Sequence, residues 1–128
     1  METSKSFSIS VIGERTQEKW FGEFTAKTLI SHRDELRRDA IRRELLGGTN
    51  PQFADVRQKN QAELFAEMSI RITKAPSWWM ESNGGMDMYD DNVIAEVYAE
   101  CLKAEQVALK AIQDAGAKAQ ADLKANAG

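Results

Sequence analysis

The chain has very little of several residue types, and each shortage excludes a class of protein. Cys101 is the only cysteine among 128 residues, so no disulfide can form within the chain, which fits a reducing compartment. His32 is the only histidine, so no metal site built on two histidines can exist. No apolar run approaches the ~20 residues that span a bilayer, and residues 1–10 lack the apolar segment of a signal peptide. We therefore expect a protein that is neither exported by the usual route nor embedded in a membrane.

An excess of positive charge is also lacking. The chain carries 17 basic and 20 acidic side chains, a net charge of −3, and we therefore expect no nucleic-acid partner. Hydrophobic residues make up 42 % and charged residues 29 % of the chain, values typical of a folded domain. Beyond Gly116 the composition shifts to alanine, lysine, aspartate and glutamine, which offer little to bury. We expect one small domain over residues 1–116 and a helical or flexible tail over residues 117–128.

Two segments near the N-terminus follow the pattern of strands. Residues 6–11 alternate polar and apolar side chains, so that Phe7, Ile9 and Val11 would face a core. Residues 20–29 are rich in aromatic and β-branched side chains, with Trp20 and Phe24 on one face. These segments predict a hairpin. Because an isolated hairpin is marginally stable in water, it must pack on helices or pair with another chain.

A first helix is predicted after the hairpin. Ser31 is a suitable N-cap, with Asp34 three residues later as a variant of the capping box. The helix should end at Gly47-Gly48, where a positive φ costs little. Its predicted apolar stripe is Leu36, Ala40, Ile41 and Leu45.

Two further helices complete the predicted fold. The second begins at Thr49-Asn50-Pro51 and is stopped one or two residues before Pro76; the third is capped by Asp90. We predict an α+β fold that is mostly helical, with the N-terminal β-hairpin packed on about three helices and the alanine-rich tail behind them. The second helix carries apolar side chains at helical spacing: Phe53, Val56, Leu64, Phe65, Met68 and Ile72.

Few residues offer catalytic or metal-binding chemistry. His32 lies in the first turn of a helix, where a surface position is favoured over catalysis. Cys101 falls on an apolar stripe, which is typical of a small core residue and not of a nucleophile. An acidic turn could offer oxygen ligands to calcium, but its spacing differs from that of an EF-hand, and turn and cap roles explain it. We expect no catalytic residue, no metal and no cofactor. The acidic turn consists of Asn83, Asp87, Asp90 and Asp91.

Basic residues gather on the first predicted helix. An arginine-rich helix can bind nucleic acid, but here Asp34, Glu35, Asp39 and Glu44 are interleaved. Such a mixed face is more typical of a solvated helix surface or of an ion-paired interface. A protein–protein contact through arginine remains an alternative. The arginines are Arg33, Arg37, Arg38, Arg42 and Arg43.

The segment between the second and third helices concentrates large apolar side chains beside Gly84-Gly85. One interpretation is a lid that folds its aromatic rings over the core. The other is an exposed adhesive surface, because tryptophan and methionine suit interfaces that adapt to a partner. On the second interpretation the candidate partner-binding residues are Trp78, Trp79, Met80, Met86, Met88 and Tyr89.

Four stretches of the chain, between Lys19 and Glu105, carry a resemblance to a known family. They are the strand WFGEFTAK at 20–27, the capped start SHRD at 31–34, RITKAPSWW at 71–79 and NGGMDMYDDNVI at 83–94. Together they resemble small structural-module proteins of tailed bacteriophages, and most of all tail assembly chaperones.

This resemblance implies a non-enzymatic function. Such chaperones bind the long helical tape measure protein in the host cytoplasm and keep it soluble while tail subunits assemble around it. A groove or loop rich in tryptophan and methionine suits a helix of this kind. The alternative is a structural virion component, such as a minor capsid, neck or decoration subunit, whose hairpin adds to a neighbouring sheet. Whether a chaperone or a virion component, the protein could also associate with a second copy through the edge of its hairpin.

Overall fold

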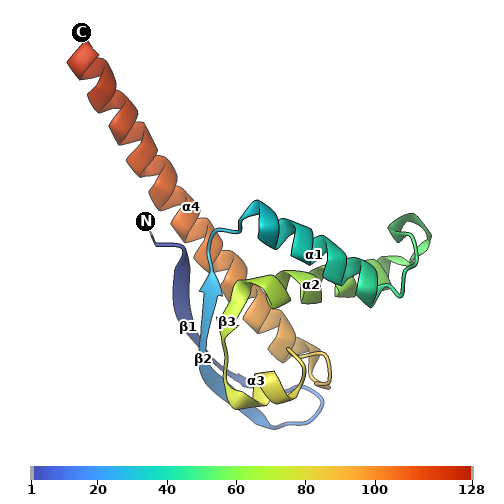
Figure 1. Ribbon diagram of the computed structural model, residues 1–128. Coiled ribbons are helices and arrows are strands. Elements are labelled where there is room, and N and C mark those ends of the chain that lie inside the picture. The colour runs from blue at the N-terminus through green and yellow to red at the C-terminus, as the bar shows by residue number, and fades with distance from the viewer. Residues whose placement is uncertain (1, 128) are drawn as a thin grey trace.

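The computed structural model describes residues 2–127 and shows the predicted α+β fold, mostly helical (Figure 1). A hairpin of β1 (Ser4–Ile12) and β2 (Lys19–Lys27) is joined by a short third strand, β3 (Ile72–Lys74), in the order β1-β2-β3. The helices are α1 (His32–Leu45), the short 3₁₀ helix η1 (Pro51–Phe53), α2 (Val56–Arg71), α3 (Ser77–Glu81) and α4 (Asp91–Ala127).

The helices cover one face of the sheet. β1 and β2 pair in antiparallel register, with Phe7 opposite Phe24 and Val11 opposite Trp20. The alternation that predicted the strands places these side chains and Ile9 against the core, whereas the serines of β1 stay exposed. The prediction that Phe7, Ile9 and Val11 face a core is confirmed. The buried centre is completed from the other elements by Met68, Trp79, Val93, Ile94 and Val97.

Asp90 connects the loop between β1 and β2 to the start of α4. Its carboxylate accepts hydrogen bonds from the backbone N–H groups of Arg15 (2.7 Å) and Thr16 (3.0 Å) and from the Thr16 hydroxyl (2.6 Å). We predicted that Asp90 caps the third helix, and it does stand immediately before α4. Its carboxylate, however, is directed to the β1–β2 loop, because that loop presents several donors that lack another partner. Gly13 lies so close to this carboxylate that a Cβ would overlap it.

The capping of α1 is confirmed, but its predicted apolar stripe is wrong. Ser31 and Asp34 form the complete capping box, and Gly47 and Gly48 follow the helix with φ of 64° and 79°. Leu36 is nevertheless 71 % exposed, and Asp34 is the buried residue of the helix. Charged side chains make much of the contact between α1 and α2. Their ion pairs are Arg38–Glu67 at 2.9 Å and Arg42–Glu63 at 3.8 Å.

The predicted second helix has different limits in the structure. Residues 51–53 form the separate η1, and α2 starts only after Asp55, whose side chain accepts a hydrogen bond from the backbone N–H of Gln58 at 2.8 Å. At its other end α2 stops at Arg71, since Ile72 pairs with Ala26 in the sheet. Arg71 is only 5 % exposed and forms ion pairs with Glu67 (2.9 Å) and, on α4, Glu105 (3.1 Å).

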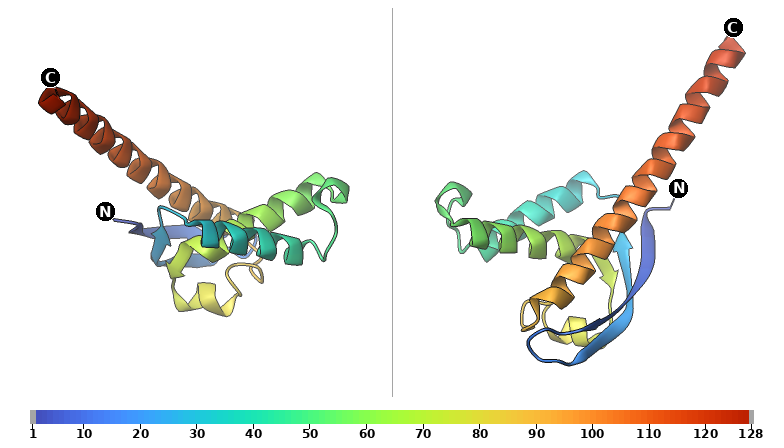
Figure 2. Two further views of the ribbon diagram at one scale, coloured as in Figure 1. Left: turned by 45° about the horizontal axis from the view of Figure 1, so that its top comes forward. Right: turned by 180° about the vertical axis from the view of Figure 1, so that it is seen from behind.

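Two helical parts project from the packed centre (Figures 1 and 2). The α1–α2 hairpin extends to one side, and α4 runs on past the sheet as a single helix to Ala127, ~55 Å in length. Residues 117–127 are thus helical, and the side chains of 117–126 are exposed. Among the described residues, none of the helices combines the length and apolar composition needed to cross a bilayer.

Candidate partner-binding surface

Both tryptophans of the candidate segment pack against the core, with Trp79 buried and Trp78 partly buried. Trp79, on α3, is 3 % exposed and packs edge-on against Phe24 with ring centroids 5.5 Å apart. Trp78 contacts Trp20 at 5.1 Å between centroids, and its indole N–H donates to the carbonyl of Phe21 at 2.9 Å. These contacts are those expected if the segment is a lid that folds its aromatic rings over the core. α3 has only five residues, Ser-Trp-Trp-Met-Glu, so its aromatic contacts stabilise it more than its own hydrogen bonds do.

The other candidate residues lie nearer the surface. Met80 is 66 %, Met86 46 % and Tyr89 70 % exposed, whereas Met88 is half-buried and packs against the core. The candidate set therefore does not form one continuous surface. Met80, Met86 and Tyr89 are exposed, Trp78 and Met88 are partly exposed, and Trp79 is buried.

Gly85 explains how the segment is shaped. It has a φ of 88°, and a Cβ there would lie 2.7 Å from Cη2 of Trp79. Only a residue without a side chain lets the backbone turn this close to the indole. The turn carries Met86 away from the tryptophans and toward the helical hairpin.

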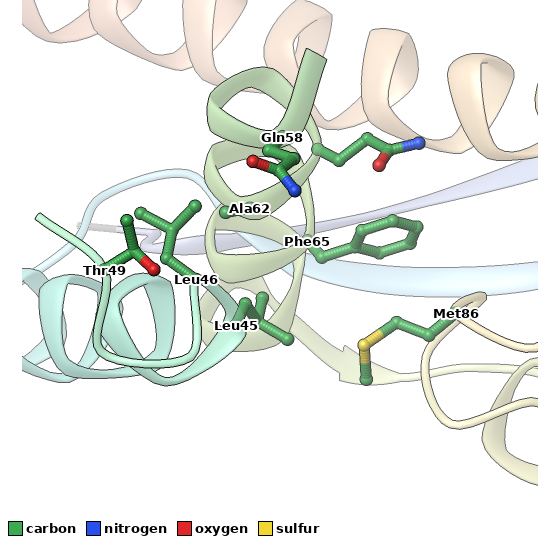
Figure 3. Close-up of a pocket in the computed structure, with 8 residues that line it drawn as sticks. Leu45, Leu46, Thr49, Gln58, Ala62, Phe65 and Met86 are labelled. Carbon is green, nitrogen blue, oxygen red and sulfur yellow. The ribbon is translucent and has the colours of Figure 1, made fainter. Parts of the chain in front are cut away.

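Met86 forms one wall of a hollow of about 370 Å³ that is lined by five apolar and three polar residues. Figure 3 shows Leu45 and Leu46 from the end of α1, and Ala62 and Phe65 from α2, around the same space. Leu45 is 39 % exposed, and Phe65 and Leu46 are half-buried. Thr49, Gln58 and Gln61 complete its lining. We call this site the apolar hollow.

Only some residues of the apolar hollow were predicted from the sequence. Leu45 and Phe65 belong to the predicted stripes and Met86 to the predicted segment, but Leu46 and Ala62 were missed. The hollow arises because α1 ends before it has covered α2, and no local pattern reports where two helices part. Further apolar side chains are exposed between the two helices: Phe53 is 75 % and Val56 is 74 % exposed.

The residues considered for chemistry are placed apart from one another. The His32 side chain is fully exposed, with Nδ1 3.7 Å from Glu35. Cys101 is 1 % exposed, and burial raises the pKa of its thiol to about 11, so it stays protonated. Within residues 2–127, no three His, Cys, Asp or Glu side chains are grouped so that they could hold a metal ion. Asp90, from the acidic turn, has a structural role, since hydrogen bonds to the Thr16 hydroxyl and the loop backbone lower the pKa of its carboxyl.

Comparison with protein-family models, with curated proteins and with solved structures gives no match to this chain.

Proposed function

We propose that this protein is a non-enzymatic tail assembly chaperone of a tailed bacteriophage, which binds the helical tape measure protein in the host cytoplasm. The observation that carries the proposal is the apolar hollow, in which Leu45 and Met86 are exposed and Leu46 and Phe65 half-buried, beside three polar side chains. Exposed apolar surface of this kind marks an interaction site in a folded protein. The resemblance of residues 19–105 to tail assembly chaperones supplies the identity of the partner.

The shape and chemistry of the hollow favour a helical partner. An amphipathic helix can place side chains at i, i+3, i+4 and i+7 into an apolar hollow between two helices. Met86 is flexible and polarisable and can adapt to different apolar side chains along a long partner. A chaperone that coats a repetitive helix needs this tolerance more than it needs one tight, specific pocket.

The positions of the reactive side chains support a role without catalysis. A general base must be oriented by a partner within a pocket, whereas His32 is fully exposed at a helix start. A nucleophilic cysteine must be accessible and ionised, whereas Cys101 is neither.

One feature favours a second candidate function, a structural virion component. β1 lies at the edge of the sheet, and it carries a single charged residue, Lys5. An edge strand with only one charged residue can pair with another strand, either of a neighbouring subunit or of a second copy. A virion subunit would use this edge permanently, whereas a chaperone leaves the assembled particle.

Co-expression with the tape measure protein of the same phage tests the chaperone proposal. We expect most of the tape measure to be soluble with this protein and insoluble without it. The double variant Leu45→Gln/Met86→Gln should lower the soluble fraction by at least about fivefold, because both side chains line the hollow. Leu36→Gln is the matched control, since Leu36 is exposed but lies outside the hollow. Equal solubility with and without the protein would contradict the proposal.

A further inference from the structure

A second hollow, of about 360 Å³, adjoins the same loop, and both aromatic and acidic side chains line it. Met86 lines the apolar hollow, and the three residues that follow it line the second one. We call it the acidic–aromatic hollow, and the residues that define it are Trp20, Trp78 and Tyr89 with Glu18, Glu81 and Asp87.

The aromatic side of this hollow is rigidly built. The rings of Trp20 and Trp78 are 5.1 Å apart and inclined at 54°. The indole N–H of Trp20 donates to buried Asp90 at 3.3 Å, and that of Trp78 donates to the carbonyl of Phe21. Tyr89 is 70 % exposed beside them. The faces of such rings carry negative electrostatic potential and attract cations.

The carboxylates add charge of the same sign. Glu18, Glu81 and Asp87 are exposed, and none of them forms an ion pair with another residue between 2 and 127. Arg15 lies in the adjacent loop but does not line the hollow. Asp87 accepts a hydrogen bond from the Asn83 side chain. The hollow therefore offers aromatic rings together with carboxylates that have no ion-pair partner. A planar guanidinium satisfies both, since it stacks on aromatic rings and donates several hydrogen bonds to carboxylates.

We propose that the acidic–aromatic hollow binds an arginine side chain presented by the helical partner of the apolar hollow. This inference rests on the proposed function, and charge complementarity carries it. A partner helix that lies across the loop at 86–89 would place apolar side chains on one side and an arginine on the other. The arginine would fix the position of the helix, which the apolar hollow by itself leaves undetermined.

Titration of the intact protein with N-acetyl-arginine amide tests the hollow without any partner. The ¹H–¹⁵N signals of the indole N–H groups of Trp20 and Trp78 should shift, with a dissociation constant of about 1–20 mM, whereas that of Trp79 should not. N-acetyl-glutamine amide is the neutral control. The variant Glu18→Gln/Glu81→Gln should weaken binding at least about threefold, and Glu23→Gln/Glu96→Gln, with the same change in charge outside the hollow, should not.

Each other outcome overturns the proposal. Absence of shifts up to about 200 mM (roughly tenfold above the weakest expected dissociation constant), equal shifts with the neutral control, or full binding by Glu18→Gln/Glu81→Gln would remove the hollow as an arginine site. The indole signals could instead shift as the concentration of the protein itself is raised, and Arg33→Gln/Arg43→Gln could abolish these shifts. In that case the arginine in the hollow would come from a second copy of this chain. In the co-expression assay, Glu18→Gln/Glu81→Gln should lower tape measure solubility. If Leu45→Gln/Met86→Gln acts there and this variant does not, the proposed function stands and this inference fails.

Discussion

Asp90 is a buried carboxylate whose charge is stabilised by hydrogen-bond donors and not by a cation. The donors come from Thr16, Arg15 and Trp20, all in or next to the β1–β2 loop. This arrangement lowers the pKa of Asp90 below its ordinary value of 3.8, chiefly through the hydroxyl of Thr16. The same residue thus fixes the start of α4, the loop and one wall of the acidic–aromatic hollow.

Stability should therefore depend on the charge of Asp90. Because its pKa is lowered on folding, its contribution is complete above pH ~4 and is lost as the pH falls through the folded pKa. We expect Asp90→Asn to lower the melting temperature at pH 7 by about 10 °C, since donors lose their charged acceptor. Urea unfolding from pH 7 to pH 2 should show a smaller acid loss for the variant than for the wild type. Asp91→Asn, at an exposed neighbour, is the control, and an effect equal to that of Asp90→Asn would contradict this role.

The thiol of Cys101 should report global unfolding. It is buried on α4, and its pKa of about 11 leaves almost no thiolate at pH 8. We expect negligible labelling by a disulfide reagent over minutes in buffer and complete labelling in denaturing urea. Rapid labelling of the native protein would show that α4 does not stay packed on the sheet.

Gly84 and Gly85 offer a matched pair for the shape of the candidate segment. Both have a positive φ, so alanine is strained at either position. Only at Gly85 would the added methyl group overlap the ring of Trp79, whereas at Gly84 the nearest such atom is 3.9 Å away. We expect Gly85→Ala to cost about 1–3 kcal/mol more free energy of unfolding than Gly84→Ala, measured by urea titration. Equal losses would mean that the loop moves freely away from Trp79.

At the scale of elements, local patterns predicted what is decided locally. The alternation of β1, the capping box of Ser31 and Asp34 and the glycines after α1 all lie within a few residues and were recognised. β3 was missed because Ile72 is in a strand only through its pairing with Ala26, forty-six residues away in the chain. Leu36 was assigned to the core because periodicity shows which residues share a helix face but not whether ion pairs replace apolar contacts.

The candidate partner-binding surface likewise has features that the sequence predicted and features that depend on the fold. The sequence indicated that residues 78–89 are unusual, and it left open a lid or an adhesive loop. Trp79 is buried and Trp78 partly buried against the core. The backbone at Gly85 passes directly beside Trp79, a contact that no spacing predicts. The apolar hollow depends on how α1, α2 and the loop at Met86 meet in space. Some of its residues could therefore be predicted from the sequence, but their grouping into one site could not.

The end of α4 should be dispensable for the stability of the rest. Side chains 117–126 are exposed, and an extension without packing partners stabilises a fold little. Deletion of residues 117–128 should change the melting temperature by less than about 2 °C and remove only the helical signal of the deleted turns in circular dichroism. A large destabilisation would show that this helix end packs against the protein in solution.

At the scale of the whole molecule, a sheet covered on one face by helices carries two projecting helical parts (Figures 1 and 2). The loop at 84–89 lines the apolar hollow together with the α1–α2 hairpin, and it lines the acidic–aromatic hollow together with α3 and the hairpin of β1 and β2. β1 leaves a free edge of the sheet. A chaperone would use the hollows transiently, and a virion subunit would use the edge permanently. These two uses differ in where the protein is found after assembly.

The most direct test measures the amount of this protein by quantitative mass spectrometry. Purified phage particles are compared with the lysate of infected cells. We predict abundant protein in the lysate together with unassembled tape measure, and less than about one copy per particle, because a chaperone is released when tail subunits replace it. A fixed number of copies in every particle would contradict the account and make this protein a structural subunit.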